Sequence, residues 1–434
     1  MSSPQNLFDE LCTVDHLFLA WKNLNKTNLG SFGLTGESVQ DFRSNLDANL
    51  ENLSKLLSSR KFEFSAARPY LIAKDNGKFR PLQIPEVKDR VVLKALAIIL
   101  ERELQSLIQP SEGVSFAYQK RIGIKDALLK IKEYYEKGDK YVYEADIIDF
   151  FGTVNRNVLL ETIFSHLPDK TINDLIKSGI TPKVDGLNQI AEEHRKLFED
   201  KGGIPQGNAL SPLFSNIYLA PFDSEMKKLN YHLVRYADDF VIMCSTNEQA
   251  RLAYEKSREY LQSSLSLQIH KLGEEATSKT RIIDPEKHVF SFLSVSFDGK
   301  QLFPSVKNKN EFIEKLMALC NAGKKGDIIT LLNKVKNSHD GWISTFLFCD
   351  VPRYFEEIDW MINAGVYKYL KGCGWKLQKK SLGKLPTRFR KIGTKVLESG
   401  ECLSEEKRKN SGILLSKDLY KLRMPKLIKS SSKS

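Results

Sequence analysis

The chain has few cysteines, and none of them are closely spaced. No two of the six form a C-x-x-C pair. Structural zinc ribbons need such pairs, so the sequence excludes this class of site. Scattered thiols are typical of a reducing compartment, where disulfides are rare. The six residues are Cys12, Cys244, Cys320, Cys349, Cys373 and Cys402.

Long apolar runs are also missing. No stretch approaches the ~20 consecutive apolar residues of a membrane-spanning helix. The opening "MSSPQNLFDELC" lacks the basic-then-apolar pattern of a secretory signal. No internal repeat is present, and only the tail "KSSSKS" is of low complexity. We therefore expect a cytoplasmic protein without a membrane partner.

Acidic residues are scarce in the last third of the chain. Residues 301–434 hold 27 Lys+Arg and 13 Asp+Glu, whereas residues 1–300 hold 39 and 41. The net charge of +12 therefore arises wholly in the C-terminal part. A basic segment on a near-neutral body indicates a polyanion partner such as nucleic acid, although a solvated lysine-rich surface explains the charge equally well.

Local patterns predict a mixture of helices and strands. The start of the chain is expected to be helical with one strand hairpin, the middle to mix strands with helices, and the end to be helical and basic. A helix is expected to begin with Ser211 as N-cap and Pro212 at its first helical position. The main domain boundary of the chain is predicted near the change in composition around residues 300–305. Further strands are expected near residues 267–270, 280–283 and 289–297.

Two adjacent aspartates interrupt an apolar stretch, "HLVRYADDFVIMC". Asp238 and Asp239 are compatible with a simple hairpin turn, because aspartate tolerates turn geometry. The alternative is a divalent-metal site, which needs a third carboxylate. Asp146, near the end of the predicted strand in "YEADIIDFFGTVNR", is the candidate. Carboxylates placed this close repel one another unless cations neutralise them, and Mg²⁺ suits such a group.

The order of three motifs resembles that of reverse transcriptases. "ADIIDFF", "GIPQGNALSPLFSN" and "YADD" follow one another as polymerase motifs do in this family, most closely in its group II intron-like bacterial members. "KDNGKFRPLQIPEVKDRVVLKAL" is similar to their fingers segment, "SKTRII" and "FSFLSVSF" to their lysine and primer-grip motifs, and "GWISTFLFCDVPRYFEEIDWMI" to their thumb.

This resemblance implies an α+β fold of the right-hand polymerase type, with fingers, a palm of antiparallel sheet plus helices, and a helical thumb. Residues 1–139 would form an N-terminal extension and fingers, residues 140–300 the catalytic palm, and residues 301–434 a basic helical thumb and tail. The scattered cysteines fit the further expectation that no zinc-bearing nuclease is present.

The resemblance also implies a two-metal active site. Asp146, Asp238 and Asp239 would be the catalytic carboxylates and would hold two Mg²⁺ ions, for which Mn²⁺ is an alternative. The backbone carbonyl of Ile147 would add a ligand. Two such ions activate a 3′-hydroxyl and stabilise the leaving pyrophosphate.

The resemblance assigns the incoming deoxynucleotide to residues of the fingers and of the glycine-rich loop. Arg80 and Lys74 would clamp the triphosphate as forked and point-charge donors, with Lys78 as a substitute for Lys74. Gln206 and Gly207 would face the new base pair. An ordinary glycine loop before a helix is the alternative interpretation of that stretch.

Two further residues would act on the sugar and on the leaving group. Phe151, five residues after Asp146, matches the steric gate that excludes a 2′-hydroxyl in this family. A core phenylalanine is the alternative. Lys279 matches the lysine thought to protonate pyrophosphate.

The resemblance places the primer and template near Tyr236, Leu293 and Ser294. Two departures affect these contacts. Ser294 stands where the primer-grip motif usually has glycine, and "SFAYQKRIG" differs from the usual glycine-phenylalanine-arginine-proline pattern.

We therefore expect an RNA-directed DNA polymerase that adds dNMP to a 3′ end on an RNA template. A stand-alone bacterial enzyme of antiviral defence, working with a dedicated non-coding RNA, is favoured. A group II intron-encoded maturase without an endonuclease domain is one alternative, and a catalytically idle RNA-binding protein on the same scaffold is another. Expected partners are the RNA template, dNTPs and the cDNA product. A protein partner or a homo-oligomer is left open.

Overall fold

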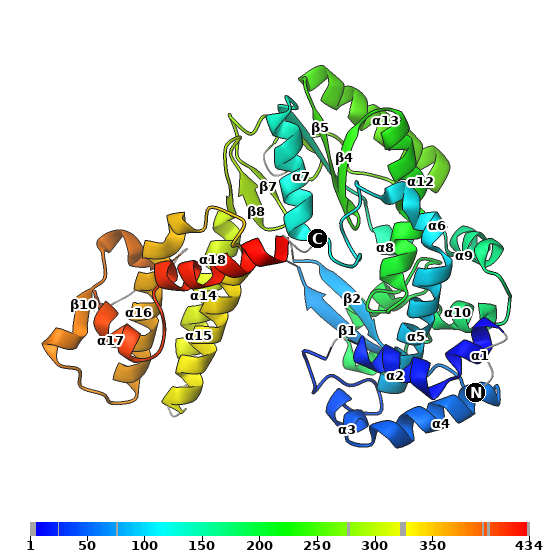
Figure 1. The fold of residues 1–434 in the computed structure, drawn as a ribbon, viewed down its shortest axis with the longest axis horizontal. Helices are drawn as coiled ribbons and strands as arrows, with labels where there is room; N and C mark the ends of the chain where they lie inside the picture. Colours follow the sequence, from blue (N-terminus) through cyan, green and yellow to red (C-terminus); the bar gives the residue numbers. More distant parts are fainter. Residues whose placement is uncertain are drawn as a thin grey trace. The chain divides into compact units, whose positions relative to one another are not determined.

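The chain forms two compact units, Met1–Ile283 and Asp284–Ser434, which Figure 1 traces in colour from blue to red. Both units combine helices with small antiparallel sheets, so the α+β class is confirmed. The division into fingers, palm and thumb stays a prediction. The structure is a computed structural model that describes residues 6–24, 26–74, 77–275, 278–321, 327–392, 395–396 and 400–431.

Unit 1 is mainly helical. Its strands are β1 (Arg68–Ala73), β2 (Phe79–Ile84), β3 (Tyr141–Asp146), β4 (His232–Tyr236), β5 (Asp239–Cys244) and β6 (Arg281–Ile283). Its longer helices are α2 (Val14–Lys22), α4 (Leu46–Ser58), α5 (Val87–Glu103), α7 (Ile124–Glu136), α9 (Arg156–His166), α12 (Ser211–Lys228) and α13 (Asn247–Leu265). Its shorter helical segments are α1 (Leu7–Leu11), α3 (Val39–Ser44), α6 (Gln105–Ile108), η1 (Gln109–Ser111), α8 (Phe150–Thr153), α10 (Asn173–Gly179), η2 (Leu187–Gln189), α11 (Glu192–Arg195) and η3 (Lys196–Phe198).

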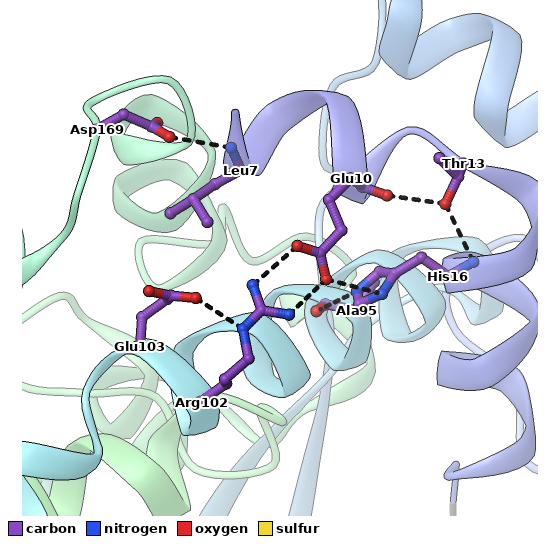
Figure 2. A network of polar contacts seen from close by, with 8 residues as sticks. All are labelled: Leu7, Glu10, Thr13, His16, Ala95, Arg102, Glu103 and Asp169. Atoms are coloured by element: carbon purple, nitrogen blue, oxygen red, sulfur yellow. Dashed lines mark hydrogen bonds and ion pairs between the residues drawn. The ribbon is translucent and has the colours of Figure 1, made fainter. Parts of the chain in front are cut away.

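The N-terminal helices are fixed on α5 by polar contacts. Arg102 of α5 donates two hydrogen bonds to the Glu10 carboxylate, at 2.7 and 2.8 Å. The Nε2 atom of His16 on α2 lies 2.9 Å from the Ala95 carbonyl oxygen of the same helix. Figure 2 shows this network, in which the hydrogen bonds from the guanidinium lower the pKa of the Glu10 carboxyl. With buried apolar residues such as Leu11, these contacts make α1 and α2 part of the core of unit 1.

The strands β1 and β2 form an antiparallel hairpin, as the sequence predicts. The backbone N–H of Lys74 donates to the carbonyl of Lys78 at 2.7 Å and closes the turn. The sequence predicts Asp75, Asn76 and Gly77 in this turn, and the first two of them lie outside the described residues. At the far end of the hairpin, the N–H of Gln83 donates to the Gln206 carbonyl at 3.0 Å. The hairpin is therefore bonded to the glycine-rich loop that precedes α12.

The central sheet of unit 1 is antiparallel, with strand order β4–β5–β3–β6. Helices α12 and α13 cover one face (Figure 1). On that face the Tyr143 hydroxyl lies 2.8 Å from a serine hydroxyl of α13, and Phe240 packs against Phe222 of α12 with ring centroids 5.2 Å apart. Side chains alternate along a strand, so Asp146 and Asp239 belong to the opposite face.

A fully buried ion pair joins β4 to α12. Arg235 donates from Nε to one oxygen of Asp223 at 2.7 Å and from Nη2 to the other at 2.5 Å, and neither side chain is exposed. Its Nη1 donates to the side-chain oxygen of Asn216 at 3.2 Å and to the carbonyl of Ala237 at 2.9 Å. Buried charges are tolerated when their partners have good geometry, and this guanidinium has four acceptors.

Unit 2 contains a three-stranded antiparallel sheet of order β7–β8–β9, and its described residues include four helices of 16 to 18 residues. In its described residues, as in those of unit 1, the helices are too short or too polar to cross a bilayer. The strands are β7 (Phe290–Phe292), β8 (Val295–Phe297), β9 (Leu302–Pro304), β10 (Leu382–Lys384), β11 (Lys391–Ile392), β12 (Lys395–Val396) and β13 (Glu401–Leu403). The helices are α14 (Val306–Asn321), α15 (Ile328–Thr345), η4 (Pro352–Tyr354), α16 (Phe355–Gly372), η5 (Lys379–Ser381), η6 (Thr387–Phe389), α17 (Glu405–Asn410) and α18 (Ser416–Ser431).

Two local predictions are wrong. Leu210, and not Ser211, is the N-cap of α12, because the Ser211 hydroxyl instead donates to the buried carbonyl of Pro205 at 2.5 Å. Residues 267–270 form no strand. After the left-handed residue Ser266, this segment makes a single antiparallel bridge between Ile269 and Ile147, the residue that follows β3. The stretch 289–297 is extended, as expected, but folds as the hairpin β7–β8.

Removing one partner of the buried ion pair should destabilise unit 1. Arg235→Met leaves the Asp223 carboxylate buried without its cation, and we expect a loss of about 3–5 kcal/mol in the free energy of unfolding. Urea unfolding followed by circular dichroism measures this loss. The double variant Arg235→Met/Asp223→Leu removes both charges and should recover most of it. Equal stability of wild type and Arg235→Met would contradict this role of the pair.

Candidate active site

The tip of the β4–β5 hairpin is a two-residue turn made by Ala237 and Asp238, since Tyr236 pairs with Asp239 across it. The hairpin-turn interpretation of the paired aspartates is therefore confirmed. Ala237 has a φ of 60°, a left-handed conformation that normally favours glycine. The hydrogen bond from Arg235 to its carbonyl helps to hold this conformation. The turn thus has a fixed backbone beside the carboxylate of Asp238.

The structure brings the three predicted carboxylates together. The register of the sheet places Asp146 directly opposite Asp239, on the face away from α12 and α13. Asp238 follows in the adjoining turn. All three line one cavity of about 810 Å³. Their catalytic role stays a prediction, but the predicted strand and hairpin do meet at this point.

The electrostatics of this cluster are unfavourable for three negative charges. Loss of water raises the pKa of Asp238, and the charge of Asp146 raises it further. Asp239 is exposed on one side, but its pKa is raised to about 7, chiefly by partial loss of water and then by the charges of Asp238 and Asp146. Lys279, Arg80 and Lys74 lower these pKa values only in part, so the cluster keeps uncompensated negative charge near neutral pH.

One lysine and one histidine reach the edge of the cluster. Lys279 Nζ lies 2.5 Å from Asp146 Oδ2, and His270 Nε2 lies 3.9 Å from the same oxygen. Loss of water lowers the pKa of His270, and the charge of Lys279 lowers it further, so this imidazole is neutral at neutral pH. Lys279 is therefore the charged partner of Asp146.

The donor set suits a hard divalent cation. Mg²⁺ takes carboxylate oxygens and completes its shell with water and phosphate. In the part of the chain that the structure describes, no three His, Cys, Asp or Glu side chains have the geometry of a metal centre, and Lys279 takes up one oxygen of Asp146. The raised pKa values of Asp238 and Asp239 nevertheless show unbalanced charge that a cation would neutralise. The residues fit Mg²⁺ chemically, and the ions stay a prediction.

The glycine-rich loop packs directly against neighbouring backbone. A Cβ on Gly203 would lie 2.1 Å from the carbonyl oxygen of Phe151, which accepts a hydrogen bond at 2.8 Å from the N–H of the next loop residue. Only glycine fits that approach. Gly207 has a φ of 97°, and a Cβ there would lie 3.0 Å from the Gln83 carbonyl oxygen. The loop therefore locks β2 to the segment that carries Phe151.

The two adjacent phenylalanines have different environments. Phe150 is 1% exposed and belongs to the core. Phe151 is half-buried, lies 5.5 Å from the Phe150 ring at an interplanar angle of 80°, and lines the cavity that contains the carboxylates. Its ring also borders a second cavity of about 440 Å³. The position of Phe151 is thus compatible with a steric gate, whereas Phe150 has the core environment.

The cavity wall includes most of the other predicted site residues. Tyr236 is not among the lining residues and pairs with Asp239 in the sheet. Leu293 and Ser294 belong to unit 2, where they form the β7–β8 turn with φ values of 51° and 67°, so the turn forms without the usual glycine. The predicted residues that line the cavity with the carboxylates are Lys74, Arg80, Ile147, Phe151, Gln206, Gly207 and Lys279.

The polar residues behind the β4–β5 turn are not predicted from the sequence. Arg235 stands inside an apolar strand pattern, and that position was the available signal, because a buried charge needs a partner. Its partners Asp223 and Asn216 lie on α12 and are not recognisable from local sequence. Tyr118 was also missed: it lines the cavity while 51% exposed, and partial loss of water raises the pKa of its phenol, with a further contribution from the charge of Asp238.

Several known proteins are similar to this chain over about half of its length. Protein YkfC of Escherichia coli is 27% identical over 281 residues, which cover 55% of this chain and 70% of YkfC. The group II intron-encoded protein LtrA of Lactococcus lactis is 27% identical over 229 residues, which cover 51% of this chain but 35% of LtrA. The putative COX1/OXI3 intron 1 protein of Saccharomyces cerevisiae is 24% identical over 221 residues, or 50% of this chain and 25% of that protein.

These relatives include intron-encoded proteins, as the resemblance to the group II intron-like branch predicts. The family model for reverse transcriptase (RNA-dependent DNA polymerase) matches residues 72–297, which is more than half of the chain. This segment contains β3, the glycine-rich loop and the β4–β5 hairpin, which line the cavity described above. The chain therefore belongs to the reverse transcriptase family.

Proposed function

We propose that the chain is an active RNA-directed DNA polymerase that adds dNMP to a primer 3′ end on an RNA template and releases pyrophosphate. The observation that carries this proposal is the meeting of Asp146, Asp238 and Asp239 in one cavity of unit 1. Membership of the reverse transcriptase family supports it. A catalytically idle RNA-binding protein would have no need of three charges that repel one another in a partly dehydrated site.

The chain's own residues supply binding and positioning. Arg80 and Lys74 stand on the wall of the same cavity and would clamp the triphosphate, Arg80 through its forked donors. Lys279, whose Nζ donates to Asp146, would give a proton to the leaving pyrophosphate. Mg²⁺ held by Asp146 and the two hairpin aspartates would activate the primer hydroxyl and neutralise the leaving group.

Asp238→Asn should separate activity from stability. The substitution keeps the shape of the side chain and removes a metal-binding charge, so we expect primer extension to fall by at least roughly 100-fold. The charge of Asp238 is unfavourable in the metal-free protein, so the variant should be at least as stable as wild type. Extension of a labelled DNA primer on RNA with Mg²⁺ measures the activity, and thermal unfolding measures the stability. Asp174→Asn, on the exposed side of α10, is the control and should keep wild-type activity.

Phe151→Ala should relax the choice of sugar. If the ring excludes a 2′-hydroxyl, its removal will raise the incorporation of rNTPs relative to dNTPs. Paired single-nucleotide incorporation assays give this ratio. Phe150→Leu changes the buried neighbour and should leave the ratio unchanged. A wild-type ratio in the Phe151 variant would assign the ring to packing.

The biological role is a finer proposal. We infer, as the first candidate, a bacterial defence enzyme that copies a dedicated RNA. The similarity to intron-encoded proteins supports a group II intron maturase as the second candidate. Sequencing the nucleic acids that co-purify with the chain distinguishes the two. A short non-intron RNA with matching cDNA supports the first, whereas recovery of intron RNA would reject it.

A further inference from the structure

Tyr118 and Asp149 line the cavity that contains Asp238, and Ala237 adjoins it; all three have left-handed backbone although none is glycine. Ala237 has a φ of 60° and Tyr118 a φ of 61°. This conformation is unfavourable for residues with a side chain and persists where the surrounding structure imposes it. Ala237 directly precedes Asp238, and Tyr118 itself lines the cavity with Asp238. The backbone conformations of Ala237 and Tyr118 therefore set the directions of the Asp238 carboxylate and the Tyr118 ring, which line the same cavity.

One buried side chain, Asn216 of α12, is bonded to both segments. Its Nδ2 donates to the carbonyl of Ala117, the residue before Tyr118, at 3.0 Å. Its Oδ1 accepts from Nη1 of Arg235 at 3.2 Å, and the same Nη1 donates to the Ala237 carbonyl at 2.9 Å. Asn216 is 2% exposed, so these bonds are shielded from water. A single amide thus connects the backbone around Ala237 and Tyr118.

The backbone supports the same connection. The N–H of Phe116 donates to the Arg235 carbonyl at 2.9 Å, and the N–H of Arg235 donates to the Val114 carbonyl at 2.7 Å. These bonds make a parallel bridge between Ser115 and Arg235 at the edge of the sheet. The segment that leads to Tyr118 is therefore attached to the strand that leads to Asp238.

We propose that Asn216 is a positioning residue that holds the Tyr118 ring and the Asp238 carboxylate at a fixed separation, and that the ring stacks on a nucleobase of the primer–template duplex. This rests on the proposed polymerase function. The Tyr118 side chain is 51% exposed while lining the cavity, which leaves an aromatic face open to a ligand. Such faces bind bases of any sequence, as a template-copying enzyme requires.

The test compares binding with turnover. Fluorescence anisotropy with a labelled DNA primer annealed to RNA gives Kd, and single-nucleotide incorporation at saturating duplex gives kcat. Tyr118→Ala should raise Kd roughly 5-fold to 100-fold, the range for loss of one stacked base, and change kcat little. Tyr118→Phe should keep the wild-type Kd. Asn216→Ala should raise Kd as Tyr118→Ala does and also lower kcat, because the support of Arg235 is weakened.

A double-mutant cycle decides whether Asn216 acts through Tyr118. The variant Asn216→Ala/Tyr118→Ala should bind the duplex no more weakly than Tyr118→Ala alone. Additive losses would overturn the proposal. If Asn216→Ala does not fold, Asn216→Asp keeps an acceptor for Arg235, removes the donor to Ala117 and enters the same cycle.

The matched control is Asn363→Ala, which removes another asparagine that is 1% exposed, in unit 2. It should leave Kd unchanged. An equal rise in Kd would mean general loosening of the protein and would reject the proposal. Because Kd is measured without turnover, loss of the proposed function would appear separately, as wild-type protein that binds duplex but does not extend primers.

Discussion

The position of the β4–β5 turn, which carries Asp238, depends on a charge pair on the other side of the sheet. Arg235 points from β4 toward α12, where Asp223 and Asn216 meet it without exposure to water. An unpaired charge in that place costs several kcal/mol, so the guanidinium has few alternative arrangements. Its remaining donor reaches the carbonyl of Ala237 and helps to fix the left-handed residue before Asp238. The turn that carries the acidic residues is thus specified from within the core.

The two faces of the central sheet of unit 1 carry different kinds of side chain. Its α12–α13 face carries aromatic packing, as between Phe240 and Phe222, and satisfied buried polarity. Its other face carries Asp146 and Asp239, whose mutual repulsion opposes folding of the metal-free protein. The packing of α12 and α13 must therefore help to stabilise an arrangement in which the carboxylates repel one another. Sites that bind or catalyse commonly reduce stability in this way.

Sequence reasoning succeeded where the signal is local. Alternation and turn residues predicted the β1–β2 and β4–β5 hairpins, and a run of β-formers predicted the strand that ends at Asp146. The motifs then identified the side chains that share the cavity. Predictions from the sequence failed where the conformation of a residue depends on a hydrogen-bond partner outside its local sequence pattern. Ser211 has an ordinary N-cap sequence, but the carbonyl of Pro205 takes its hydroxyl. The partners of Arg235 and the strained backbone of Tyr118 depend on tertiary contacts that no single stretch contains.

The contact between Gly203 and Phe151 limits how this protein can diverge. The carbonyl oxygen of residue 151 already occupies the space in which any side chain at residue 203 would begin, 2.1 Å away. No change of rotamer relieves an overlap with backbone, so even alanine at 203 would have to displace α8 or the loop. The side chain of residue 151 has no such restriction, because it is half-buried and lines a cavity. Substitutions can therefore change the side chain at residue 151, while residue 203, its neighbour across the backbone, is closed to every other amino acid.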